Sequence, residues 1–108
     1  MAIERRIVIK PNAPGASPRV TFDPNPLKAN PSDQIFWTNN DTQAHWPGRK
    51  NADGTINATF FMSNQIAPGG DVSPVFSTIV NGTLTYICTI AGHQNETGSI
   101  VISTTPAP

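Results

Sequence analysis

The chain has 108 residues, enough to bury one hydrophobic core without support from disulfide bonds. Lys and Arg together number 7, as do Asp and Glu, so the formal net charge is zero. A neutral chain lacks the electrostatic attraction that draws a protein to nucleic acid or to an anionic membrane, so we expect neither as a partner. No apolar run approaches the roughly 20 residues that cross a bilayer, and we expect no membrane span.

Short β-rich runs alternate with turn sequences along the N-terminal half. The 11 prolines and 8 glycines are scattered through the chain, where they interrupt any helical periodicity. The predicted strands in this half are RRIVIK (5–10), RVTFD (19–23) and QIFWTN (34–39). We interpret residues 25–33 as a connection and residues 39–43 as a turn that leads to AHWPG (44–48).

The C-terminal half continues in the same way. We expect a solvent-exposed loop at 49–57 and turns at 66–71 and at Asn81-Gly82. The predicted strands are ATFFM (58–62), VSPVFSTIV (72–80), TLTYICT (83–89) and GSIVIS (98–103). The proline within 72–80 suits an edge strand, because proline has no N–H for a neighbouring strand.

These runs amount to about seven or eight strands with no convincing helix, so the sequence predicts an all-β, antiparallel Greek-key β-sandwich. We expect one domain over residues 1–108, frayed at 104–108. Alternation with a period of two places Leu84 and Tyr86 on the core face of their strand. Cys88 then lies at the core end of that strand, where the next loop begins.

Three residues with metal-binding side chains stand out. Cys88 is the only cysteine, and His45 and His93 are the only two histidines. One reading is that Cys88 is merely a buried structural thiol. A thiolate with two imidazoles is also the donor set that suits copper in a trigonal site, and with a fourth ligand the same set could hold zinc.

Two segments of the sequence resemble the cupredoxins, the small blue copper proteins of the plastocyanin and azurin type. IAPGGDVSPVFSTIVNGTLTYICTIAGHQNETGSIVI (66–102) has their PG turn, Y-x-C, ligand loop and G-x-I-x-V. ANPSDQIFWTNNDTQAHWPG (29–48) is similar to the segment in which a Trp strand and an N-N-D turn precede the first copper histidine. The resemblance runs from about Val20 to Ile102.

The resemblance implies that one copper ion is held by His45, Cys88 and His93, with His93 at the solvent edge. In azurin-like members the carbonyl at the position of Ala44 adds a weak contact. The family implies a monomer that carries one electron between larger redox proteins, which would dock near His93, and that catalyses nothing itself. Location in the periplasm or outside the cell is likewise implied; the N-terminal residues show no signal-peptide pattern, which leaves a cytoplasmic chain or a mature exported one.

The sequence departs from the family at the axial position, where most members have methionine. HQNETG contains none, and alignment on Gly98 puts Glu96 there, whereas counting from His93 puts Thr97 there. The other candidates are the carbonyl of Ala44 or no axial ligand at all. Met62 lies in an apolar run, and we interpret it as a core residue.

Trp46 is a second departure, because many cupredoxins place an asparagine there that ties the two ligand loops together. Asn39 or Asn40 are candidates to supply this tie. Two other functions stay open. An open or carboxylate-ligated, red-copper-like site could bind or transform a small molecule, and a copper carrier could use the same ligands without redox chemistry.

Overall fold

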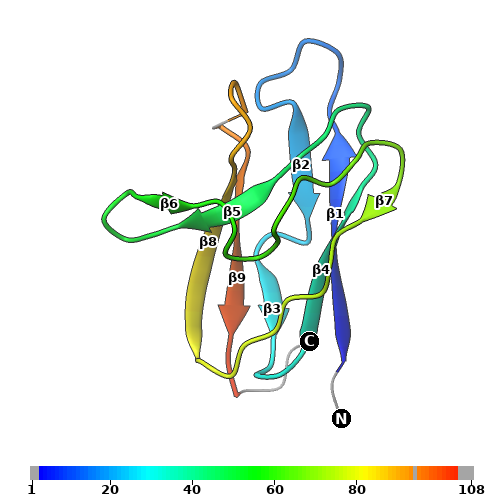
Figure 1. Cartoon of the computed structure of the whole chain (residues 1–108). Helices are drawn as coiled ribbons and strands as arrows, with labels where there is room; N and C mark the ends of the chain where they lie inside the picture. Colours follow the sequence, from blue (N-terminus) through cyan, green and yellow to red (C-terminus); the bar gives the residue numbers. More distant parts are fainter. Residues whose placement is uncertain (1–2, 94, 105–108) are drawn as a thin grey trace.

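The computed structural model describes residues 3–93 and 95–104, and over these residues the chain is a sandwich of two β-sheets (Figure 1). One sheet has the strand order β2-β1-β4-β7, and the other has the order β3-β9-β8-β5-β6. The strands are β1 Glu4–Pro11, β2 Val20–Asp23, β3 Leu27–Ala29, β4 Gln34–Asn39, β5 Pro47–Lys50, β6 Ile56–Asn57, β7 Asp71–Val72, β8 Gly82–Cys88 and β9 Thr97–Ile102. The predicted all-β sandwich is confirmed.

Two strand pairs are parallel, which corrects the expectation of an antiparallel sandwich. β1 pairs with β4 in parallel, and β3 pairs with β9 in parallel, whereas every other named pair is antiparallel. Parallel neighbours require a crossover connection. Here the chain crosses to the other sheet at β3 and then returns as β4, beside β1 and in the same direction.

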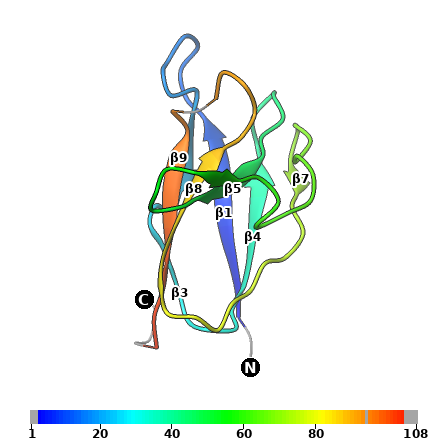
Figure 2. The same ribbon diagram turned by 60° about the vertical axis from the view of Figure 1, so that its left-hand side comes forward.

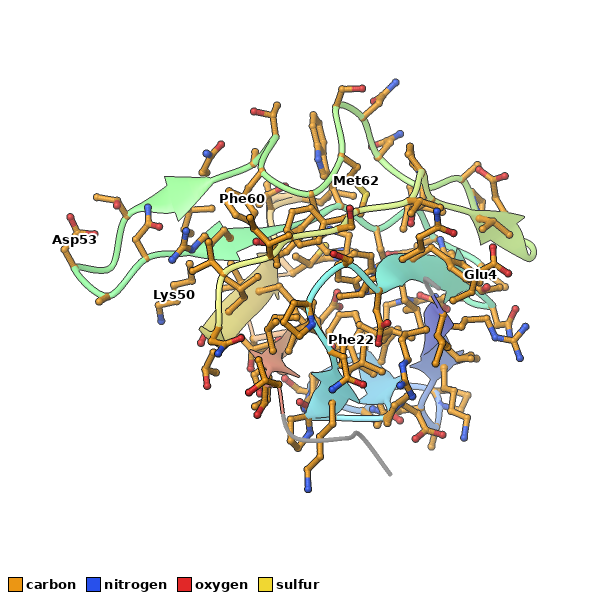
Figure 3. All side chains as sticks on the ribbon, turned by 90° about the horizontal axis from the view of Figure 1, so that it is seen from below. Glu4, Phe22, Lys50, Asp53, Phe60 and Met62 are labelled. Carbon is orange, nitrogen blue, oxygen red and sulfur yellow. The ribbon has the colours of Figure 1, made fainter. Side chains whose placement is uncertain are left out.

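Several expected boundaries were wrong. Residues 25–33, expected to be a connection, contain β3, and the expected loop 49–57 contains the end of β5 and all of β6. Together β5 and β6 form a hairpin that projects from the sandwich, with Lys50 and Asp53 on it (Figures 1 and 3). Both errors concern short strands that carry too few residues for an alternating pattern: β3 pairs with the distant β9, and β6 pairs with β5 in an exposed hairpin.

Two expected strands are mostly irregular. Residues 58–62 form no strand; instead Phe61 and Met62 bury their side chains in the core. In the run 72–80 only Val72 is part of a strand, and Phe76 forms a single bridge with Ile35. Pro74 lies between these two points and has no N–H to extend the ladder. The expected turn at Asn81-Gly82 is absent too, because Gly82 is the first residue of β8.

The core lies between the two sheets, where side chains fill the interior (Figure 3). Alternation puts Ile35 and Trp37 of β4 inside on one layer, and Tyr86 of β8 faces them from the other. The ring centroids of Trp37 and Tyr86 are 5.4 Å apart at an interplanar angle of 88°, an edge-to-face contact that aromatic pairs favour. Leu84 packs against this cluster, which agrees with its predicted place on the core face of the strand.

One end of the sandwich gathers the segments that carry the candidate ligands. Cys88 ends β8 opposite Pro47, and Thr97 begins β9 opposite Ile87. The loops that carry the candidate ligands, 40–46 and the described residues 89–93 and 95–96, lie at the top of Figures 1 and 2. Within the described ranges no helix is long and apolar enough to cross a membrane. Residues 105–108 of the expected frayed tail lie outside those ranges.

Candidate metal centre

The loop after β8 turns back on itself and returns to Cys88. The backbone N–H of His93 donates to the carbonyl of Ile90 at 3.0 Å, and that of Glu96 donates to the carbonyl of His93 at 3.0 Å. Gly92 has φ of 85°, a left-handed conformation that glycine adopts without strain. The Cys88 N–H then donates to the Glu96 carbonyl at 2.9 Å, which closes the loop. Cys88, His93 and Glu96 are therefore held by one short, hydrogen-bonded segment.

His45 is placed by a different set of contacts. Its backbone exchanges two hydrogen bonds with Ile66, at 3.2 and 2.8 Å, and its side chain is fully buried. The Asn39 amide donates to the carbonyls of Gln43, Ile66 and Ala67 at 2.8 to 3.2 Å. Asn39 therefore anchors the His45 loop to the segment at 66–67.

The tie between the two ligand loops comes from Thr89 and Trp46, and not from Asn39 or Asn40, the two candidates that the sequence offered. The Thr89 N–H and hydroxyl both donate to the Trp46 carbonyl, at 2.8 and 2.9 Å. The Trp46 N–H donates in turn to Cys88 Sγ at 3.4 Å. Trp46 takes part through its backbone N–H and carbonyl alone, so a tryptophan side chain is compatible with this role.

Four side chains converge at this end of the sandwich: His45, Cys88, His93 and Glu96. Cys88 Sγ lies 3.7 Å from Nδ1 of each histidine. Glu96 Oε1 lies 3.0 Å from His45 Nδ1 and 3.2 Å from His93 Nδ1. All four donor atoms lie within 4.8 Å of one another. The structure thus brings together the three expected ligands and Glu96, one of the axial candidates, while metal binding by them stays a prediction.

Burial separates the axial alternatives. Glu96 is 2% exposed and directs a carboxylate oxygen at both histidines, whereas its neighbour Thr97 is exposed at the start of β9. Adjacent residues of a strand point to opposite faces, so only one of the two can face the cluster. Met62 lies in the hydrophobic core cluster, as expected. The weak contact from the Ala44 carbonyl stays a prediction.

A cation suits this cluster because it would pair a buried carboxylate oxygen with the ring nitrogens that face it. Glu96 Oε1 is sealed from solvent, and Nδ1 of His45 and Nδ1 of His93 lie 3.0 and 3.2 Å from it. Burial of an unpaired carboxylate oxygen is costly. One sulfur, two imidazole nitrogens and one carboxylate oxygen are donors that copper and zinc both accept. The residues present therefore fit a transition-metal ion.

The thiol resists ionisation in the metal-free protein. Burial raises the pKa of Cys88, and the negative charge of Glu96 acts in the same direction. Hydrogen bonds from the backbone at Trp46 and Ile90 lower the pKa but only partly offset this. The metal ligand is the thiolate, so metal binding must release the Cys88 proton.

No protein-family model and no curated protein sequence matches the chain, but solved structures do. A purple cupredoxin from Nitrosopumilus maritimus superposes with a TM-score of 0.73 and 22% identity, over 91% of this chain and 98% of that one. Amicyanin from Paracoccus versutus gives a TM-score of 0.62 and 12% identity, over 94% and 81%. A mutant amicyanin in its reduced state gives 0.62 and 19%, over 94% and 82%. The chain has the cupredoxin fold.

Within this cupredoxin fold, sequence reasoning missed two residues behind His45. Asp41 Oδ2 lies 2.7 Å from His45 Nε2 and 2.7 Å from Arg19 Nε. Burial would raise the pKa of Asp41, but hydrogen bonds from Arg19 and His45 outweigh it and lower that pKa to about 2. The only local signal was the position of Asp41 four residues before His45, and nothing in the sequence pointed to Arg19.

Proposed function

We propose that this chain binds one copper ion through His45, Cys88, His93 and Glu96 and carries single electrons between redox partners. The observation that carries the proposal is the convergence of four donor atoms within 4.8 Å at one end of a cupredoxin fold. A bound copper ion supplies a one-electron couple there. The remaining steps belong to the protein, which holds the ligands in place and provides a route to the partner.

A rigid frame suits electron transfer, because ligands that shift at each change of oxidation state slow the reaction. Three of the four ligands lie on the segment from Cys88 to Glu96, whose hydrogen bonds close on the end of β8. His45 is held by its bridge to Ile66 and by the side chain of Asp41. Both loops are thus supported by paired strands, which keeps the site preorganised.

Differences in exposure indicate the route to a partner. The side chain of His93 is 14% exposed, whereas that of His45 is fully buried. His93 is therefore the ligand nearest to solvent, and we propose that redox proteins dock transiently around it. The monomeric state and an exported location, periplasmic or extracellular, are parts of the same proposal and follow from the family resemblance.

Glu96 should set the character of the site. A carboxylate is a hard, anionic donor that favours Cu(II) over Cu(I), so it lowers the reduction potential relative to a thioether. Close binding by Glu96 should also weaken the blue absorption that a long axial methionine permits. We therefore expect a copper protein of low potential whose colour departs from blue.

The two other candidate functions have less support. Glu96 Oε1 already faces both histidines, so it would compete with an external small molecule for the fourth position. A copper carrier must release its ion readily, whereas the side chains of three of the four ligands are shielded from solvent. No catalytic step is part of the proposal.

The test is a titration of the purified protein with Cu(II), followed by visible absorption and EPR. We expect a strong thiolate-to-copper charge-transfer band that saturates at about one equivalent, as a mononuclear site requires. Reduction and reoxidation should remove and restore the band. Absence of the band, or a band that resists reduction, would contradict the proposal, and a shift on addition of azide would favour the open-site alternative.

A further inference from the structure

We propose that Asp41, itself held by Arg19, is the residue that orients His45 toward the metal. The proposal rests on the proposed copper site, because it assigns a role to groups behind one of its ligands. The juxtaposition is an Arg19–Asp41–His45 chain that runs from the surface to the buried end of the sandwich.

The contact between Asp41 and His45 determines which ring nitrogen carries the proton. Asp41 Oδ2 and His45 Nε2 are 2.7 Å apart, and both side chains are at most 1% exposed. A carboxylate can only accept, so Nε2 must donate its N–H. In a neutral imidazole the other nitrogen then has a free lone pair. That nitrogen, Nδ1, is the atom that faces Cys88 and Glu96.

Asp41 cannot rotate away from His45, because its own position is fixed. Its backbone N–H donates to Asn39 Oδ1 at 3.0 Å, and its carbonyl accepts from Gly69 at 3.1 Å. Arg19 donates to both carboxylate oxygens, from Nε at 2.7 Å and from Nη2 at 3.2 Å. Two-point binding of this kind holds a carboxylate in one orientation.

Arg19 also balances charge. Thiolate, Glu96 and Asp41 would place three negative groups at one end of the molecule, and Arg19 is the cation paired with Asp41. Arg19 lies directly before β2, and Ser17 lies two residues before Arg19. The Ser17 hydroxyl oxygen accepts a hydrogen bond of 2.6 Å from the side chain of Asn95, which belongs to the loop that carries His93. The segment before β2 thus contacts both ligand loops.

His93 provides a contrast within the same site. In the part of the chain that the structure describes, no carboxylate is paired with Nε2 of His93. Only one of the two candidate histidine ligands is therefore oriented by an acid behind it. A hydrogen-bonded carboxylate fixes the tautomer of a metal-binding histidine and makes it a stronger donor, and loss of such a partner typically costs about 10–100-fold in metal affinity.

The experiment compares Asp41→Asn, Asp41→Ala and Arg19→Lys with the wild-type protein. The first readout needs no metal: ¹⁵N NMR of the histidine rings reports the tautomer of His45 in the metal-free protein. We expect Nε2 of His45 to carry a proton in the wild type and to be partly unprotonated in Asp41→Ala. Asp41→Asn keeps a hydrogen-bond acceptor without the charge, so it should retain more of the tautomer than Asp41→Ala.

The second readout is the metal itself. We expect both Asp41 variants to lose about 10–100-fold in Cu(II) affinity and to have a higher reduction potential, by about 59 mV for each tenfold change in the Cu(II)-to-Cu(I) affinity ratio. Arg19→Lys keeps the charge but loses the two-point contact with Asp41, so it should fall between the wild type and the Asp41 variants in all three properties. If Asp41→Ala fails to fold, the same measurements on Asp41→Asn and Arg19→Lys still test the proposal.

Asp33→Asn is the matched control. Asp33 is another buried carboxylate paired with an arginine, Arg5, at 3.0 Å, and it lies outside the ligand cluster. It should lower stability without changing the His45 tautomer or the potential. An unchanged tautomer, affinity and potential in both Asp41 variants would overturn the proposal. Failure of copper to bind the wild type would overturn the proposed function, while the NMR readout would still test the orientation of His45.

Discussion

Glu96 Oε1 lies 3.0 Å from Nδ1 of His45, and neither side chain is reached by solvent. Asp41 occupies the other ring nitrogen of His45, so Nδ1 presents a lone pair to the carboxylate when the ring is neutral. Two acceptors at this distance repel each other unless a positive charge lies between them. The relationship therefore favours a proton or a metal cation at this point, and it makes the charge of Glu96 the first property to vary.

Replacement of Glu96 by Gln should raise the reduction potential of the copper-loaded protein. The substitution keeps the shape but removes the negative charge that stabilises Cu(II). Each tenfold change in the Cu(II)-to-Cu(I) affinity ratio corresponds to about 59 mV, which cyclic voltammetry resolves. Glu96→Met should raise the potential further and shift the absorption toward blue. Equal reduction potentials in the wild type and both variants would show that Glu96 is not a copper ligand.

Cys88→Ser should abolish the charge-transfer band and leave the fold intact. Cys88 is fully buried at the end of β8, and serine has nearly the same shape, so the sandwich should tolerate it. Burial of a hydroxyl in place of a thiol is expected to cost about 1–3 kcal/mol. Circular dichroism checks the fold, and visible absorption checks the site. A band that survives in this variant would show that the thiolate is not its source.

Thr89→Val should loosen the connection between the ligand loops. The variant keeps the branched shape and the backbone N–H but removes the hydroxyl bond to the Trp46 carbonyl. The expected loss of stability is about 0.5–1.5 kcal/mol by urea denaturation, together with broader EPR lines because the ligands are held less firmly.

Thr85→Val is the matched control for this change, since Thr85 lies on β8, the strand that Thr89 follows, and is exposed. It should leave the EPR linewidth unchanged and alter the free energy of unfolding by no more than about 0.5 kcal/mol, as is usual at surface positions. Broadening in both variants, or in neither, would count against the role of Thr89.

Acid should destabilise the metal-free protein partly through Asp33. Its burial would raise the pKa, but hydrogen bonds from Asn30, Arg5 and Ile3 outweigh this and hold it below the ordinary value of 3.8. Because the pKa is lower in the folded state than in the unfolded state, the Asp33 carboxylate stabilises the protein fully at pH values above 3.8. The stabilisation is lost as the pH falls through the folded-state pKa.

Urea denaturation between pH 7 and pH 3 measures this effect. Asp33→Asn should be less stable than the wild type at pH 7, since it leaves Arg5 without its partner, and the difference should shrink toward pH 3. A difference that is constant across this range would mean that ionisation of Asp33 does not contribute.

The sequence alone was sufficient for the all-β sandwich and for three of the four candidate ligands. Period-two alternation is a local property, so it located the strand 34–39 and the core face with Leu84 and Tyr86. Scarcity and spacing of His45, Cys88 and His93 identified a ligand set, because chemical type is visible in a sequence. The same local signals failed at β3 and at 58–62, where pairing and burial depend on distant segments.

Only the tertiary structure decided between Glu96 and Thr97, since strand direction and burial at the start of β9 determine which one faces the histidines. It also revealed Arg19, which contacts Asp41 across 22 positions of sequence. A hydrogen bond between such distant residues leaves no periodic trace in the chain. Residue type and alternation are thus encoded locally, whereas the partner of each buried charge is determined by how the two sheets and their loops come together.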